Sequence, residues 1–239
     1  MERDAVTRRC VVSCCHSENA DRVGYYGKYA DRLERSLDKF AVGSARRIWR
    51  NRWPVGSPSH SAHNYAFKAY AVRMALRAGF DSVMWLDAGC ELIADIKPLW
   101  DEIDARGYGI LSAWDTLGEW VSDEALERYK VSRDEAMNLK LGGGCYVGVS
   151  RDSEAGMKFF DEWFYLASRT TLFRGYHSDG SGSTAMRSLI LDGPEGKLVS
   201  TDPRVKGHRS DEACFSLYAH ANGLATLPLS EFYKVARTY

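Results

Sequence analysis

The chain has 239 residues, and its 32 basic and 32 acidic side chains give a formal net charge of zero. This balance disfavours a dedicated nucleic-acid binder, which normally carries a basic excess. No run approaches the roughly 20 apolar residues that a membrane-spanning helix needs, and the charged start "MERDAVTRRC" lacks the apolar core of a secretory signal. We therefore expect a cytoplasmic protein built as a single domain over residues 1–239.

Strand and helix patterns alternate from the N-terminus onward. Residues 10–15, "CVVSCC", predict a short buried strand, and residues 27–40 carry apolar side chains at helical spacing. Residues 40–43, "FAVG", predict a second short strand. Residues 43–63 are basic and aromatic and are interrupted by proline and serine, so we expect a long loop there.

The alternation continues to the end of the chain. Helices are predicted at 64–80, 96–109, 153–169 and 208–224, strands at 82–86, 108–114 and 142–151, and an acidic helical excursion at 117–140. Ser210 or Asp211 is the predicted N-cap of the last helix. The pattern predicts an α/β fold with a mainly parallel central sheet and helices on both faces.

An aspartate follows the most apolar of these strands. The run "VMWL" ends in Asp87, and Gly89 follows two residues later. Ligands of open parallel sheets bind beyond the carboxyl ends of the strands, where a carboxylate can hold a divalent cation that neutralises a diphosphate. Gly89 would leave room for such a ligand near the backbone. The alternative is that Asp87 only caps the turn after the strand.

Three segments, taken together, resemble the GT-A-fold glycosyltransferases, which use nucleotide sugars. "VMWLDAGCELIADIKPLW" is similar to their metal-binding segment, in which a hydrophobic strand ends in Asp-x-Asp. "LGGGCYVGVSRDSEAGMKFFDEW" resembles their glycine-led acceptor-side strand and the helix behind it. "HRSDEACFSLYAHANGL" resembles their late His-x-x-Asp-Gln segment, and Lys68 stands where several such families have a basic residue. The resemblance covers about residues 8–225 and implies a single-domain, Rossmann-like GT-A fold.

The resemblance assigns roles to individual residues. It implies that the first strand and its loop hold the nucleotide base, that Asp87 binds the diphosphate through Mn²⁺ or Mg²⁺, and that Asp211 acts on the sugar or the acceptor. Loops 43–63 and 173–188 would close over the donor. The candidates are Asp87, Asp211 and Glu212 as catalytic residues; Ser13, His16, Lys68, Gly143, Gly144 and Asp161 as substrate-binding residues; and Asp87, Glu91 and His208 as metal ligands.

Two departures from the family pattern bear on this interpretation. Gly89 replaces the second aspartate of Asp-x-Asp, so the metal site is an Asp-Ala-Gly variant, and Glu212 stands where glutamine is usual. Glu91 would supply the second carboxylate, or it is a surface residue. Without a metal, the diphosphate would be neutralised by basic side chains, namely Arg46, Arg47, Arg50, Arg52 and Lys68.

The expected function is transfer of a sugar from a UDP- or GDP-sugar to a hydroxyl acceptor. The acceptor stays open among a glycan, a lipid-linked sugar, a protein side chain and a modified nucleobase, and so does the choice between retention and inversion. Two alternatives belong to other classes: an inactive nucleotide-sugar-binding module and a nucleotidyltransferase. The glycine- and arginine-rich phosphate loop of nucleotidyltransferases is absent after the first strand, in "SCCHSENADR".

Overall fold

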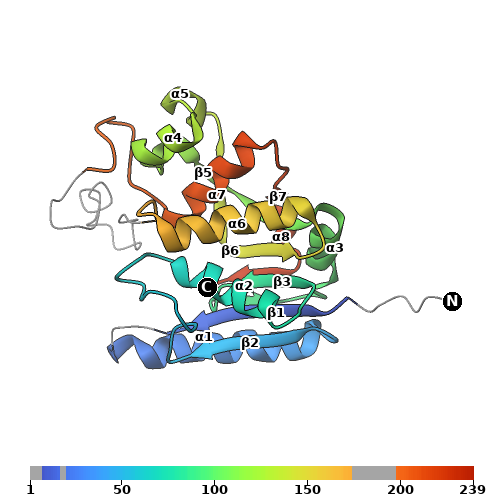
Figure 1. The fold of residues 1–239 in the computed structure, drawn as a ribbon. Helices are drawn as coiled ribbons and strands as arrows, with labels where there is room; N and C mark the ends of the chain where they lie inside the picture. Colours follow the sequence, from blue (N-terminus) through green and yellow to red (C-terminus); the bar gives the residue numbers. More distant parts are fainter. Residues whose placement is uncertain (1–6, 17–19, 174–197) are drawn as a thin grey trace.

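A computed structural model describes residues 7–16, 20–173 and 198–239; of residues 20–25 it describes the backbone alone. The loop predicted at 173–188 lies, from residue 174 onward, outside the described residues. Figure 1 shows the arrangement of its helices and strands. The elements are β1 (Arg9–Cys15), α1 (Ala20–Phe40), β2 (Ala45–Arg50), α2 (Ala66–Arg77), β3 (Ser82–Leu86), β4 (Cys90–Leu92), α3 (Lys97–Arg106), β5 (Tyr108–Thr116), a 3₁₀ turn (Leu117–Glu119), α4 (Asp123–Tyr129), α5 (Arg133–Ala136), β6 (Lys140–Ser150), α6 (Glu154–Arg169), α7 (Ser210–Ala221), β7 (Leu227–Pro228), α8 (Leu229–Phe232) and β8 (Ala236–Thr238).

The main sheet has the strand order β2-β1-β3-β6-β5-β7. Strands β1, β2 and β3 pair in parallel, β6 is antiparallel to both β3 and β5, and β5 pairs in parallel with β7. Five described strands therefore run in one direction, and β6 runs in the other. The prediction of an α/β fold with a mainly parallel sheet is confirmed.

Helices cover both faces of this sheet, because its strands alternate their buried side chains between two cores. In β3, Val83 and Trp85 face one core, and Met84 and Leu86 face the other, as the twofold period of a strand requires. The first core lies against α2, α6 and α7, and the second against α1, α3 and α8. Burial on both faces explains why the centre of the sheet reads as an uninterrupted apolar run.

The antiparallel direction of β6 places its glycines beside the end of β3. Leu86 is registered with Tyr146, and the Asp87 amide donates a hydrogen bond to the Cys145 carbonyl at 2.9 Å. The amino-terminal end of β6 therefore lies at the same edge as the carboxyl ends of β1 and β3. A second, two-stranded sheet of β4 and β8 follows the Asp87 turn and places Tyr239 next to Gly89.

The second predicted strand is wrong in position. Residues 41–44 form a turn, and the strand β2 lies over 45–50, inside the predicted loop. Its arginines made this segment look like a loop, but they pair with the exposed face of α1: Arg46 with Asp38, and Arg50 with Asp31 and Glu34. Charged side chains are typical of an edge strand, where they discourage pairing with other chains.

Candidate active site

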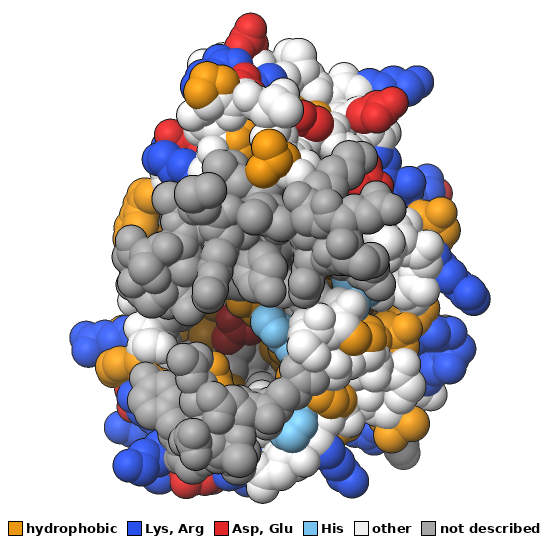
Figure 2. Space-filling view, turned by 90° about the vertical axis from the view of Figure 1, so that its left-hand side faces the viewer, with side chains coloured by type: hydrophobic (Ala, Val, Ile, Leu, Met, Phe, Trp, Pro, Cys, Tyr) orange, Lys and Arg blue, Asp and Glu red, His pale blue; other side chains and the backbone are white. Residues whose placement is uncertain are grey.

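A cleft of about 830 Å³ runs along the edge where β1 and β3 end. Residues from both halves of the sheet line it, including His16 after β1, Asp87 after β3, Gly144 in β6 and Trp114 in β5. Figure 2 views the molecule from this side and shows a hollow with an acidic side chain at its bottom and a histidine on its wall. A concave site at this edge is where ligands of open α/β sheets bind.

Asp87 presents its carboxylate to this cleft directly from the tip of β3. Its side chain is 39% exposed, and its Oδ1 accepts a hydrogen bond from the Trp85 indole Nε1 at 2.7 Å. The Asp87 carbonyl in turn accepts a bond from the Cys90 amide, which closes a tight turn. The carboxylate is thus fixed in orientation on one oxygen and open to a ligand on its exposed side.

Lys68 is a fully buried cation at the floor of the cleft. It comes from α2, and its Nζ lies 3.4 Å from Asp87 Oδ1, 3.3 Å from Asp211 Oδ2 and 2.9 Å from the Gly144 carbonyl that accepts its hydrogen bond. Burial alone would lower the pKa of Lys68, but Asp211, Asp87 and Glu212 raise it above its usual value. Lys68 is therefore protonated, and its charge links α2 to the start of α7, to the tip of β3 and to β6.

Asp211 lies behind Lys68 and has almost no contact with solvent. It is 1% exposed, at the start of α7. Burial raises its pKa to about 7, Lys68 opposes this rise, and Glu212 and Asp87 add to it. Neither Asp211 nor Ser210 caps α7, because the helix begins at Ser210 and has no side-chain cap. The predicted N-cap is wrong, since both side chains are buried under the cleft.

Glu212 is the carboxylate of α7 that reaches the cleft. Its Oε1 accepts a hydrogen bond from the Gly144 amide at 2.8 Å, and its Oε2 accepts one from Arg209 Nε at 2.8 Å. Arg209 also lines the cleft, with its guanidinium 5.4 Å from the centre of the Trp120 ring. Both oxygens of Glu212 are thereby oriented by fixed donors.

The glycine run of β6 exists because α7 packs directly on it. A Cβ on Gly142 would lie 2.4 Å from the Phe215 ring, and a Cβ on Gly144 would lie 2.9 Å from Glu212 Cγ. A side chain at position 142 would push α7 away from the sheet, and one at position 144 would displace the side chains of Glu212 and Lys68. The two glycines therefore bring Glu212 and Lys68 to the backbone of Gly144.

The segment before α7 is held by a buried histidine. His208 is fully buried, its Nδ1 accepts a hydrogen bond from the Ser122 amide at 3.1 Å, and its Nε2 lies 2.6 Å from the Leu172 carbonyl. Burial lowers the pKa of His208 to about 4, so it is neutral, with Nε2 as the donor. It joins residue 172 to the turn before α4 and so fixes the start of α7.

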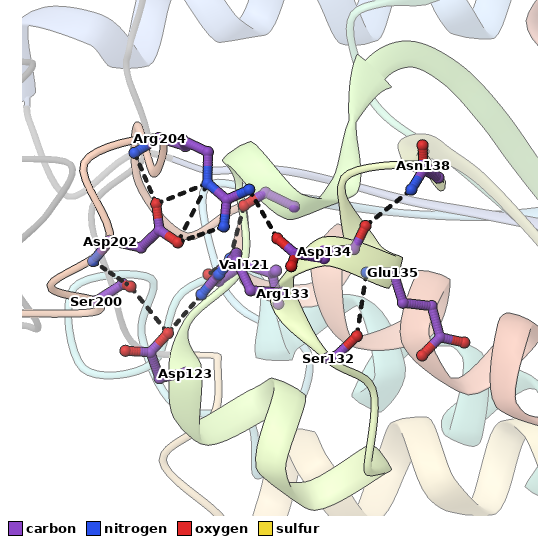
Figure 3. Close-up of polar contacts among 11 residues, drawn as sticks. Val121, Asp123, Ser132, Arg133, Asp134, Glu135, Asn138, Ser200, Asp202 and Arg204 are labelled. Carbon is purple, nitrogen blue, oxygen red and sulfur yellow. Dashed lines mark hydrogen bonds and ion pairs between the residues drawn. The ribbon is translucent and has the colours of Figure 1, made fainter.

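On the surface, a network of polar side chains further attaches the segment before α7 to α4 and α5. Figure 3 shows Arg204 between Asp202 and Asp134, and Arg133 bonded to Asp123. Ser200 donates to the same Asp123 carboxylate at 2.8 Å. These contacts tie residues 200–204 to α4 and α5, the excursion predicted at 117–140. That excursion is thus the support on which the loop before Arg209 and Glu212 rests.

The structure brings seven of the predicted site residues together around the cleft. Six of them line it, and Asp211 lies behind Lys68. The seven are His16, Lys68, Asp87, Gly143, Gly144, Asp211 and Glu212.

Four other predicted residues lie elsewhere. Ser13 is fully buried within β1, and Asp161 is exposed on α6; neither lines the cleft. Glu91 is registered with Arg237 in the small sheet and also lies outside the cleft lining. Both ring nitrogens of His208 are used by the backbone, which leaves neither for a metal. The structure therefore does not support these four assignments. Periodicity could not separate a buried serine or histidine from a site residue.

Three of the basic side chains expected to neutralise a diphosphate form ion pairs with carboxylates of the protein itself. Arg46 and Arg50 are paired with α1, and Lys68 is paired with carboxylates. Sequence reasoning missed Arg209, which is the one arginine among the described residues that line the cleft. Its position, directly before the Ser-Asp-Glu start of α7, is the signal that could have identified it.

The metal site can be judged from the donors that face the cleft. Among residues 7–16, 20–173 and 198–239, no group of three His, Cys, Asp or Glu side chains is placed to hold a metal ion. A preformed all-protein site is therefore not present in that part of the chain. Mg²⁺, however, is usually held by one or two carboxylates together with substrate phosphates. The exposed side of Asp87 fits this second arrangement, in which the cation arrives with the diphosphate.

Comparisons with known proteins find similarity in the fold but not in the sequence. No protein-family model and no curated protein matches the sequence. None of the described helices has the length and apolar character needed to cross a membrane.

Several solved structures resemble this one. A glycosyltransferase involved in the glycosylation of the major capsid of PBCV-1 is 11% identical with a TM-score of 0.40, over 68% of this chain and 67% of that one. The apo bifunctional glycosyltransferase WbbM is 11% identical with a TM-score of 0.43, over 70% of this chain and 35% of its own. Apo mouse xyloside xylosyltransferase 1 is 9% identical with a TM-score of 0.46, over 92% and 84%. No activity follows from likenesses at this level.

Proposed function

We propose that this protein is a glycosyltransferase that moves a sugar from a nucleotide diphosphate sugar to a hydroxyl acceptor. The observation that carries the proposal is the order of groups along one cleft. Aromatic rings lie where β1 ends, the Asp87–Lys68 pair lies at the middle, and the oriented Glu212 carboxylate lies over β6. A nucleotide sugar has the same order: a flat base, a charged diphosphate and a polar sugar.

The aromatic end of the cleft suits a nucleoside. His16 and Trp53 pack edge to face, with ring centroids 4.7 Å apart, and Trp53 lies 4.8 Å from Phe67. A base can stack on or beside such rings at low cost in conformational entropy. The first strand therefore supplies the base site through His16 rather than through the buried Ser13.

The middle of the cleft requires added positive charge. Among the described residues, Lys68 and Arg209 face three carboxylates, those of Asp87, Asp115 and Glu212, which leaves a formal charge of −1 along the lining. A diphosphate would be repelled by this surplus unless a cation accompanied it. Asp87 would hold a Mn²⁺ or Mg²⁺ ion, and the bound ion would stabilise charge on the leaving diphosphate.

The remaining groups act on the sugar and on the geometry of the site. Glu212, held by Gly144 and Arg209, is positioned to contact sugar hydroxyls or to stabilise the positive charge that develops at the anomeric carbon. Asp211 has no such access, so its role is to hold Lys68, and Lys68 orients Asp87. Asp211 is thus a positioning residue, and Glu212 is the carboxylate assigned to the reacting sugar.

A donor screen tests this proposal. UDP-, GDP- and CMP-sugars are incubated with the protein, with and without Mn²⁺, and nucleotide binding and nucleotide release are measured. We expect one donor to bind and turn over, and Asp87→Asn to lower turnover at least a hundredfold while the unfolding midpoint changes little. Asp152→Asn, an exposed carboxylate outside the cleft, is the matched control. Absence of binding by every nucleotide and nucleotide sugar would refute the proposal.

One observation favours a second candidate, an inactive nucleotide-sugar-binding module. The position of the second family aspartate is Gly89, and a Cβ there would lie 3.1 Å from the Tyr239 carbonyl oxygen. A side chain at position 89 would therefore require the Tyr239 backbone, just after β8, to give way slightly. A thermal shift with a nucleotide sugar but no release of nucleotide with any acceptor or with water would identify the binding module.

A further inference from the structure

The far end of the cleft carries an exposed aromatic pair that the donor does not use. Trp114, in β5, is 69% exposed, and its ring lies 5.9 Å from that of Tyr233, which follows α8. Both residues line the cleft. An exposed tryptophan contributes little to the core, and large apolar groups left open to solvent in a cleft mark binding sites.

The backbone of β5 is shaped to present this ring. Ser112 is registered with Gly142 and Thr116 with Lys140, so residues 113–115 lie opposite Leu141 alone. Such a bulge turns side chains away from the regular alternation and is common beside active sites. Trp114 and Asp115 are therefore both turned outward into the cleft instead of one of them entering the core.

The sheet order separates this end from the nucleoside end. In the order β2-β1-β3-β6-β5-β7, the strand that His16 follows (β1) and the strand that carries Trp114 (β5) flank β3 and β6, at whose junction Asp87 lies. A donor with its base at β1 and its diphosphate at Asp87 directs its sugar toward β6 and β5. The aromatic pair is thus on the side from which the acceptor must approach.

From this arrangement we infer that the acceptor is a carbohydrate whose ring stacks on Trp114. The inference rests on the proposed function and names the acceptor class of the same site. A pyranose has an apolar face that packs on an indole and a rim of hydroxyls. Polar groups line the same cleft: the Asp115 carboxylate next to Trp114 in the chain, the Thr238 hydroxyl 3.4 Å from Tyr233 Oη, and the Arg209–Glu212 pair. Apolar rings with a few polar groups are the usual composition of a small-molecule site.

The charges around the pair disfavour a nucleic-acid acceptor. Beyond Asp87 the cleft lining carries the carboxylates of Asp115 and Glu212, and its one arginine among the described residues, Arg209, is already paired with Glu212. Nucleic-acid sites instead need an excess of cations to neutralise phosphates. A neutral sugar meets no such repulsion.

Indole NMR resonances test the inference in the intact chain. The protein has seven tryptophans, and the indole resonance missing from Trp114→Ala belongs to Trp114. Lactose, maltose, cellobiose, mannobiose and N-acetyllactosamine are titrated separately. We expect at least one of them to shift this resonance and to bind at least tenfold more weakly to Trp114→Ala, with Trp114→Phe intermediate. Tyr165→Ala, which removes an exposed ring outside the cleft, should bind normally.

The outcomes separate this inference from the proposed function. Nucleotides should shift other indole resonances and leave that of Trp114 in place. If nucleotides bind but none of the five saccharides does, or if Trp114→Ala binds them unchanged, the carbohydrate acceptor is overturned and the donor site stands. If a saccharide binds at Trp114 but no nucleotide binds anywhere, the glycosyltransferase fails and the sugar site stands. Transfer to a serine peptide in place of all five saccharides would also overturn the inference.

Discussion

Replacing Lys68 with methionine removes the buried charge that joins Asp87, Asp211 and Gly144. The ammonium group lies within 3.4 Å of both carboxylates and donates to the Gly144 carbonyl at 2.9 Å. Methionine has a similar length but leaves Asp211 buried without a cation. Removing one partner of a buried ion pair costs about 3–5 kcal/mol of unfolding free energy. We expect this loss at pH 8, which a domain of ordinary stability tolerates while remaining folded.

The loss should depend on pH with a definite sign. The folded pKa of Asp211 is about 7, above its ordinary value of 3.8. The folded protein therefore keeps a proton that the unfolded chain releases, and stability falls as pH rises from 4 to 7. Lys68 restrains this rise, so Lys68→Met should move the pKa higher and extend the fall above pH 7. The difference in unfolding free energy between wild type and Lys68→Met should be constant from pH 5 to 7. Above pH 7 it should widen by up to about 1.4 kcal/mol per pH unit.

Urea unfolding at half-unit pH intervals from 5 to 9 measures this gap. Lys158→Met removes an exposed lysine paired with Glu154 and is the matched control; because exposed ion pairs contribute little, it should change stability only slightly and equally at every pH in this range. The double variant Lys68→Met, Asp211→Asn should lose the widening above pH 7, because it has no carboxyl at that position. A gap that is flat to pH 9, or that widens equally in the double variant, would refute the assignment of Lys68 and Asp211 as a coupled buried pair.

Two further predictions concern the support of the site. Gly142→Ala should destabilise the fold by about 1–3 kcal/mol, because its Cβ would meet the Phe215 ring at 2.4 Å. Its control is Gly27→Ala, in α1 with open space around it, which should be neutral or slightly stabilising. Equal effects of the two variants in urea unfolding would contradict the close packing of α7. Burial lowers the pKa of His208 in the folded protein to about 4. As pH falls from about 6.5 to 4, the unfolded chain binds a proton at this residue and the folded protein does not, so the contribution of His208 to stability should be lost over this range. The stability gap between wild type and His208→Gln should accordingly shrink on acidification, and a gap that grows would show that His208 is charged in the fold.

The parts of the fold predicted from the sequence are those governed by local pattern. The apolar run before Asp87 and the helix that ends at Gly107 follow from burial on both faces and from a glycine at φ 83°, which favours the end of a helix. The helix carrying Lys68 and the helix α7 were also predicted, each within a few residues of its observed bounds, whereas the short α8 that follows was not. Asp87 could be placed at a sheet edge because it directly follows a strand.

The remaining features depend on contacts between distant segments. The direction of β6 is not encoded in its own residues; it emerges from pairing with β3, and it alone brings Gly144 to the edge that holds Asp87. The arginines of β2 resembled a loop because their partners lie on α1. His208 resembled a ligand because nothing local shows that both of its nitrogens bond the backbone of segments 36 and 86 residues away.

The roles of adjacent carboxylates in α7 illustrate the same limit of local pattern. Asp211 and Glu212 are neighbours in the sequence, yet one is buried against Lys68 and the other reaches the cleft. Successive residues on a helix point about 100° apart, and only the packing of α7 on the glycines of β6 decides which faces the ligand. The sequence could identify the two carboxylates as site candidates, but it could not show which of them faces the cleft.

A crystal structure with bound nucleotide tests the central claim most directly. The complex is formed with Mn²⁺ and the nucleoside diphosphate that binds most tightly among UDP, GDP and CDP. We predict that the base lies against His16 and Trp53 and that the Mn²⁺ bound to the diphosphate is coordinated by Asp87. A nucleotide bound away from the edge where β1 and β3 end, or a diphosphate out of reach of Asp87, would contradict the account.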